Sequence, residues 1–114
     1  MSIEENKELY DSLIRSNPVI ERKGKTIPYT SLNGHMFSFL SKEKEGVIGL
    51  RLSANDREEF IKQFNTKIME QYGRMMKEYV EVPVSLLANK KTMKKFLQKS
   101  YDYVASLKPK STKR

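Results

Sequence analysis

The sequence predicts an α+β fold: an antiparallel sheet of about four strands, with amino- and carboxy-terminal helices packed on one face and one helix inserted between strands. Three observations predict it. Apolar residues recur with helical spacing near both ends of the 114-residue chain. Segments between them alternate apolar and polar residues, as half-buried strands do. The pair Asn33-Gly34 joins two of these segments, and Asn-Gly favours the tight turn of a hairpin.

The first helix is expected over residues 2–16, and Asn17-Pro18 ends it because the residue before a proline avoids the helical conformation. Its narrow apolar stripe consists of Leu9, Tyr10, Leu13 and Ile14. A short strand is expected at residues 19–20. The hairpin then joins residues 28–32 to residues 35–40, and Phe37 and Phe39 are expected to share the face that covers the core.

Residues 47–52 return as a third arm of this meander. Ser53 follows at the N-cap position of a second helix, with Asp56 favourably placed near the helix N-terminus, and the helix should end near Asn65. The secondary structure of residues 66–73 is ambiguous: Ile68, Met69 and Tyr72 are apolar, but Gly73 interrupts any long helix or strand. Residues 75–82 fit a last strand that has Met76, Val80 and Val82 facing inward.

The last helix is expected from residue 89 to about residue 107. Asn89 or Thr92 can accept its first free backbone N–H groups, and Pro109 cannot continue it. At 100° per residue one arc of this helix is apolar: Met93, Phe96, Leu97, Tyr101, Val104 and Leu107. The other arc is basic: Lys91, Lys94, Lys95 and Lys99. A short turn of helix after Pro83 precedes it.

The net charge of +8 is confined to the end of the chain. Residues 89–114 hold nine Lys/Arg and one acid, whereas residues 1–88 hold 13 of each sign. We expect one domain over residues 1–107 and a basic flexible tail over residues 108–114. The lysines suit three interpretations: a solvated helix face, a surface that contacts phosphates, or a docking surface for an acidic protein.

The residue types argue against an enzyme. There is no cysteine, and His35 is the only histidine, so we expect no catalytic triad, no metal site and no cofactor. Gly24-Lys25-Thr26 lacks the earlier glycine that a phosphate-binding loop needs, since Val19 stands there. An enzyme remains a third function class, which predicts a deep pocket with convergent titratable groups. No apolar run suggests a signal peptide or membrane span, so we expect a cytoplasmic protein without membrane attachment.

Three stretches resemble small bacterial proteins related to the amino-terminal domain of the competence regulator TfoX (Sxy). They are residues 20–40 (IERKGKTIPYTSLNGHMFSFL), residues 47–52 (VIGLRL) with the Ser-capped acidic helix after them, and residues 72–83 (YGRMMKEYVEVP). The likeness spans about residues 9–107 and follows element order more than any catalytic signature. Longer regulators of this kind carry an Arg-x-Met-Phe-Gly-Gly-like run where residues 22–25 stand here. The resemblance implies the order α-β-β-β-α-β-α, a non-enzymatic regulatory role and no catalytic residues.

The leading hypothesis is therefore a stand-alone domain similar to the TfoX amino-terminal domain, acting as a regulatory or binding module that associates with nucleic acid. The alternative is a protein-interaction or homo-oligomerisation module without nucleic-acid binding, as a monomer or homodimer. The candidate nucleic-acid contacts are Arg22, Lys23, Lys25, Lys91, Lys94, Lys95, Lys99, Lys108 and Lys110. Whether the cluster at residues 22–25 meets the last helix depends on the fold. Exposed Tyr29, Tyr72 and Tyr79 are weaker candidates for stacking on bases.

Overall fold

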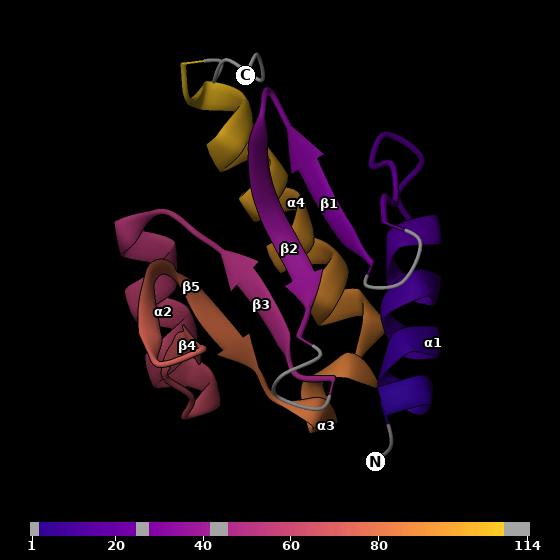
Figure 1. Cartoon of the computed structure of the whole chain (residues 1–114), viewed down its shortest axis with the longest axis horizontal. Coiled ribbons are helices and arrows are strands. Elements are labelled where there is room, and N and C mark those ends of the chain that lie inside the picture. The colour runs from indigo at the N-terminus through magenta and orange to yellow at the C-terminus, as the bar shows by residue number, and fades with distance from the viewer. Residues whose placement is uncertain (1–2, 25–27, 42–45, 109–114) are drawn as a thin grey trace.

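The computed structural model describes residues 3–24, 28–41 and 46–108. It is an α+β fold in which a five-stranded antiparallel sheet carries helices on one face (Figure 1). The elements in chain order are α1 (Ile3–Arg15), β1 (Tyr29–Leu32), β2 (His35–Leu40), β3 (Ile48–Arg51), α2 (Ala54–Phe64), β4 (Ile68–Gln71), β5 (Arg74–Val82), α3 (Val84–Leu87) and α4 (Lys90–Ser106).

The strands follow the order β1-β2-β3-β5-β4, and every neighbouring pair is antiparallel. The expected count of about four strands is one too low, because the ambiguous stretch before Gly73 forms β4. Tyr72 and Gly73 both have positive φ, 52° and 76°, so they make a two-residue turn that folds β4 back along β5. Asn33 and Gly34 turn β1 into β2 in the same way, with φ of 57° and 80°.

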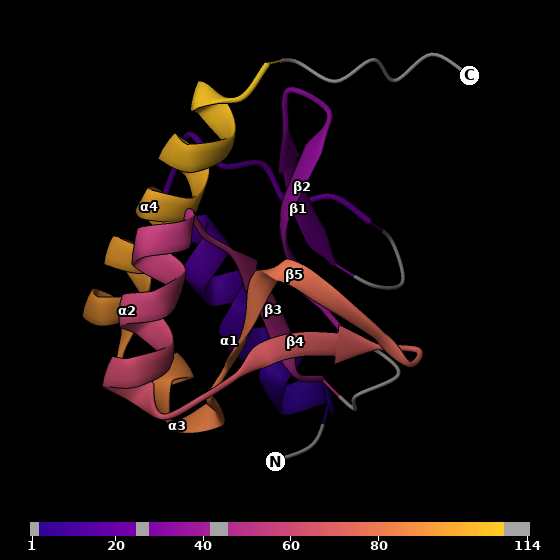
Figure 2. The same cartoon turned by 90° about the vertical axis from the view of Figure 1, so that its left-hand side faces the viewer.

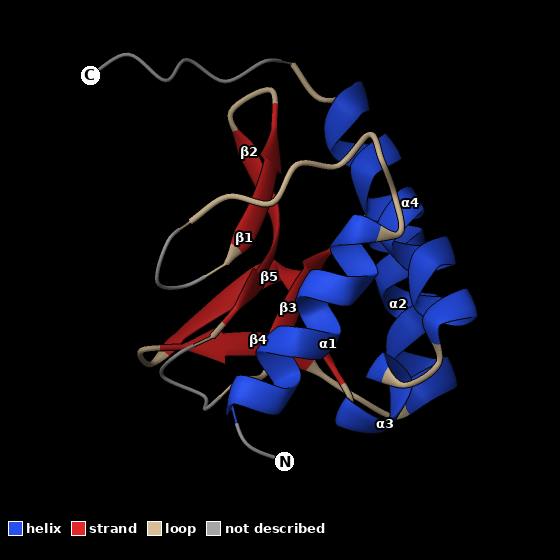
Figure 3. Ribbon diagram, turned by 90° about the vertical axis from the view of Figure 1, so that its right-hand side faces the viewer, coloured by secondary structure: helices blue, strands red, loops and turns tan. Residues whose placement is uncertain are grey.

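The helices and one face of the sheet enclose the core, as the side views show (Figures 2 and 3). The buried apolar residues of α1 and α4 are those of the predicted stripes: Tyr10, Leu13, Ile14, Met93, Phe96, Leu97 and Val104. Phe60 of α2 contacts Phe96 edge-on, with ring centroids 5.0 Å apart. Ser53 caps α2 and Asn89 caps α4, each accepting a backbone N–H three residues on.

A β-bulge in β2 overturns the expectation that Phe37 and Phe39 share a face. Tyr29 pairs with Phe39 and Thr30 with Ser38, but Ser31 pairs with Met36, so Phe37 is left without a partner on β1. Phe37 joins the core against Tyr101 of α4. Phe39 lies on the opposite side of the sheet, where it packs edge-on against Tyr79.

The bulge also brings a polar group into the core. The Tyr10 hydroxyl lies 2.5 Å from Ser38 Oγ, which lies 2.6 Å from Thr30 Oγ1. Burial raises the pKa of Tyr10 above its usual range, and the bonds to Ser38 and Thr30 only partly oppose this. These hydrogen bonds satisfy the hydroxyl groups where α1 crosses β1 and β2.

The strand expected at residues 19–20 does not form. Val19 is 60% exposed, and only the side chain of Ile20 enters the core. The backbone joins the sheet later, where Lys23 forms an isolated bridge with Tyr29. Met76 also differs from expectation: it is half-buried and lies outside the core cluster, whereas Val80 and Val82 belong to it.

Candidate nucleic-acid interface

Helix α4 is held firmly enough to present one surface to solvent. Met93, Phe96 and Leu97 point into the core, and the buried Ser100 hydroxyl donates to the Arg51 carbonyl oxygen at 2.5 Å. The residues on the other side of the helix are thereby turned outward.

Four lysines occupy that outward side in the first half of α4. Lys90, Lys91, Lys94 and Lys95 are exposed, and we call them the α4 lysine face. Within the part of the chain that the structure describes, none of them has a carboxylate within 4.0 Å. Lys95 Nζ instead lies 5.7 Å from the centre of the Phe96 ring. The charges of this face are therefore not neutralised by the fold.

Two of these lysines, Lys90 and Lys91, lie in the first turn of α4, where their charge opposes the helix dipole. The first turn of α4 contains no acidic residue, although α1 has Glu4 and Glu5 in its first turn and α2 has Asp56. Cations near the positive end of a helix are unfavourable, by about 0.3–1 kcal/mol each at exposed sites. Lysine charge and free backbone N–H groups thus add up to a local positive potential.

Lys99, one turn further along α4, does not share this freedom. Its Nζ lies 3.7 Å from Asp56 Oδ1 on α2, and its side chain is 36% exposed. This is a surface ion pair of small energetic value. Its effect is to join α4 to α2 and to lower the charge of Lys99 as seen by an outside anion.

The other candidate cations lie elsewhere. Arg22 Nε donates to Asp11 Oδ1 at 3.1 Å and its Nη1 donates to the Gly24 carbonyl at 2.5 Å. Lys23 Nζ donates to Ser31 Oγ at 3.0 Å. These two side chains are therefore engaged with α1, their own loop and β1, and no described contact joins them to the α4 lysine face.

The loop after α1 does reach α4, but through polar residues. Asn17 Nδ2 donates to Gln98 Oε1 at 2.9 Å.

Lys108 is exposed just after α4, and its carbonyl oxygen lies 2.8 Å from His35 Nε2 at the start of β2. Lys25 and Lys110 lie outside the described residues.

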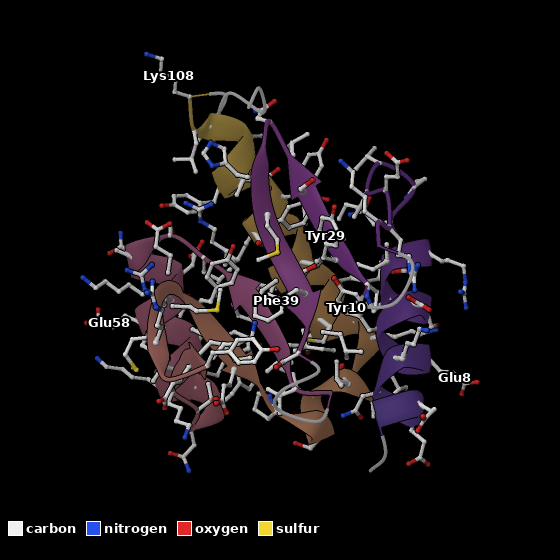
Figure 4. All side chains as sticks on the ribbon, in the orientation of Figure 1. Glu8, Tyr10, Tyr29, Phe39, Glu58 and Lys108 are labelled. Carbon is white, nitrogen blue, oxygen red and sulfur yellow. The ribbon has the colours of Figure 1, made fainter. Side chains whose placement is uncertain are left out.

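Exposed charged side chains also lie on α1 and α2. Helix α4 contacts the loop after α1 through Gln98 and Asn17, and it contacts α2 through Phe96 and Phe60. The acids exposed on the two flanking helices are Glu4, Glu5, Glu8, Glu58 and Glu59. Glu8 and Glu58 project from opposite sides of the molecule (Figure 4). Exposed cations lie on the same two helices, Arg15 on α1 and Lys62 on α2.

One cavity of about 250 Å³ is lined by Asp11, Arg15 and Arg22. The Asp11 carboxylate already accepts the Arg22 bond, so the cavity holds an ion pair and one further arginine. Among the described residues that line it there is one carboxylate, whereas general acid–base chemistry on a substrate would need two that converge. Among residues 3–24, 28–41 and 46–108, no group of three His, Asp or Glu side chains could hold a metal ion.

A polar cluster at the C-terminal end of β3 was not predicted from the sequence. The Arg51 guanidinium lies 2.6 Å from Glu78 Oε1, and the Tyr103 hydroxyl donates to Glu78 Oε2 at 2.9 Å. Burial acts to raise the pKa of Glu78, but the bonds from Arg51 and Tyr103 outweigh it and hold the pKa below its usual value. The cluster fastens α4 to β3 and β5. Residues so distant in sequence gave no local signal of it.

The three tyrosines offered as stacking candidates differ in exposure. Tyr72 is 71% exposed at the tip of the β4–β5 hairpin. Tyr29 and Tyr79 are both partly buried. The Tyr79 hydroxyl also donates to the Met36 carbonyl oxygen at 2.6 Å. The expectation of three exposed tyrosines is therefore wrong for Tyr29 and Tyr79.

The described helices include none with the length and apolar content that crossing a bilayer demands. Comparisons with models of known protein families, with curated proteins and with solved structures give no match to this chain.

Proposed function

We propose that this chain is a non-enzymatic regulatory or binding module, similar to the TfoX amino-terminal domain, that associates with nucleic acid through the α4 lysine face. The observation that carries the proposal is the set of four exposed, unpaired lysines in the first half of α4, two of them in its first turn. Phosphate contacts of this kind give affinity without sequence preference.

A purely structural role explains the lysine positions poorly. A solvated helix face needs charge, but acids in the first turn of α4 would serve solubility and also stabilise the helix. Lysine stems can also cover apolar neighbours. Lys95 lies over the Phe96 ring, so this explanation applies to Lys95. Binding of an external anion accounts for positive charge placed where the helix itself disfavours it.

The test is a titration of short fluorescein-labelled DNA and RNA with the protein, followed by fluorescence anisotropy. Four phosphate contacts predict a log–log salt slope of roughly −3.6 on a duplex. The variant Lys91→Glu/Lys94→Glu/Lys95→Glu keeps one contact, so its slope should fall to roughly −0.9. Its affinity at about 50 mM salt should drop on the order of 10³-fold.

A matched variant, Lys62→Glu/Lys67→Glu/Lys77→Glu, changes the net charge by the same amount at exposed lysines outside α4. It should retain most of the affinity. Equal loss in the two variants would mean that net charge and not the α4 lysine face governs binding. Absence of any anisotropy change with every nucleic acid at low salt would refute the proposal.

The second candidate is a protein-interaction or homo-oligomerisation module, and the β4–β5 hairpin favours it. Tyr72 and Met75 are 71% and 57% exposed at one tip, which projects away from the helices (Figure 2). Tyr72 also adopts a left-handed φ of 52°, which is unusual for an aromatic residue. Sedimentation equilibrium separates the candidates: a stable dimer that Tyr72→Ser/Met75→Ser dissociates would support this one.

A further inference from the structure

The α4 lysine face offers no aromatic surface to a nucleic-acid base. Phe96 is buried, and Tyr101 is packed edge-on against Phe37 with ring centroids 5.9 Å apart. The Tyr103 hydroxyl is engaged by Glu78, and its ring lies under the Arg51 guanidinium. The exposed residues of α4 are Lys90, Lys91, Lys94, Lys95, Asp102, Ala105 and Ser106. A base placed against the α4 lysine face therefore meets no fully exposed aromatic ring of this helix.

The exposed tyrosine of the described residues is out of reach of these lysines. Tyr72 sits at the tip of the β4–β5 hairpin, and in the side views this hairpin projects from the side of the sheet opposite α4 (Figures 2 and 3). A strand that contacted Tyr72 would have to pass around the sheet to reach α4. The two features cannot form one short single-strand site.

From this arrangement we infer that the α4 lysine face binds the paired phosphate backbones of a double helix in preference to a single strand. The inference rests on the proposed nucleic-acid function and names its substrate class. Single-strand binders gain about 1–3 kcal/mol per base from stacking on aromatic side chains, and that contribution is absent here. What remains is charge attraction, which favours the duplex because its charge density is higher.

The lysine spacing suits contact with a run of phosphates. Lys91 and Lys95, like Lys90 and Lys94, are one turn apart, about 6 Å along the axis. Four contacts on a duplex give a slope of roughly −3.6, against roughly −2.8 on a single strand. If affinities coincide at 1 M salt, the duplex binds about tenfold tighter near 50 mM salt.

The experiment compares four labelled probes with the unmodified chain: a short DNA duplex, one of its strands chosen not to self-pair, and the RNA versions of both. Anisotropy titrations at several salt concentrations give an affinity and a slope for each probe. Two variants accompany them, Lys91→Glu/Lys94→Glu/Lys95→Glu and Tyr72→Ala. A second duplex of permuted sequence tests for base readout.

Tighter binding of either duplex than of its single strand, lost in the lysine variant and kept in Tyr72→Ala, would support the inference. The DNA and RNA arms then tell which double helix is preferred. Equal or tighter single-strand binding that depends on the lysines would overturn the inference and leave the proposed function standing. Single-strand binding that Tyr72→Ala removes would assign the site to the hairpin and overturn both.

Discussion

At the scale of single residues, Gly49 shows how closely the sheet is packed on the face away from the helices. A Cβ at this position would lie 2.5 Å from Phe39 Cε1 and 2.9 Å from Cζ. The Phe39 ring is 4% exposed and packed against Tyr79, so it has little room to move. Gly49→Ala should therefore lower the free energy of unfolding by about 1–3 kcal/mol, measured by urea denaturation.

A double-mutant cycle with Phe39→Leu checks the cause. If the clash with the Phe39 ring is responsible, Gly49→Ala should cost less in the Phe39→Leu background than in the parent. A purely additive pair would show that the glycine is needed for another reason. Full stability of Gly49→Ala alone would mean that the ring moves freely.

At the scale of the element, α4 carries charges that should weaken it as a helix. Lys90→Glu and Lys91→Glu each exchange a cation for an anion at the positive helix end, so each should raise the free energy of unfolding by about 0.3–1 kcal/mol. Lys99→Glu should instead lower it, because Lys99 pairs with Asp56 at 3.7 Å. Thermal unfolding at low ionic strength measures all three.

The stabilised variants would also sharpen the functional test. Lys91→Glu should bind nucleic acid more weakly while unfolding at a higher temperature, so loss of binding could not be ascribed to loss of fold. Stability unchanged or lowered in both Lys90→Glu and Lys91→Glu would contradict the reasoning from the helix dipole.

At the scale of the whole molecule, Glu78 links β5 to Arg51 of β3 and Tyr103 of α4. Its pKa in the folded state lies below the model-compound value of 4.5. The stabilisation that the ionised Glu78 contributes to the fold is thus complete above about pH 4.5, and it is lost as the pH falls through the folded-state pKa. Glu78→Gln should reduce stability at neutral pH and flatten its decline in acid.

Denaturant titrations at a series of pH values measure this dependence. Tyr103→Phe removes one of the two hydrogen-bond partners that lower the Glu78 pKa, so its acid decline should fall between those of the parent and Glu78→Gln. A decline as steep in Glu78→Gln as in the parent would assign the acid sensitivity to other carboxylates.

Much of the secondary structure could be predicted because its signals are local. Asn33-Gly34, the Ser53 cap and the Asn89 cap each act within a few residues. The bulge at Phe37 and the contacts of Glu78 depend on partners elsewhere in the fold, and no neighbouring residue announces them. For the candidate site, periodicity identified the outward lysines, but only packing revealed that Asp56 engages Lys99 and Asp11 engages Arg22.

The unpaired Phe37 also determines which side chains of β2 face the helices and which face the opposite side of the sheet. Without the extra residue, Ser38 and Phe39 would exchange sides, so the aromatic ring would displace the hydroxyl that Tyr10 needs as a partner. One inserted residue thus allows β2 to bury an aromatic ring on each face of the sheet, Phe37 on one and Phe39 on the other. Ser38, which lies between them in the sequence, keeps its hydrogen bond with Tyr10. The protein gains a second, smaller apolar layer behind its main one.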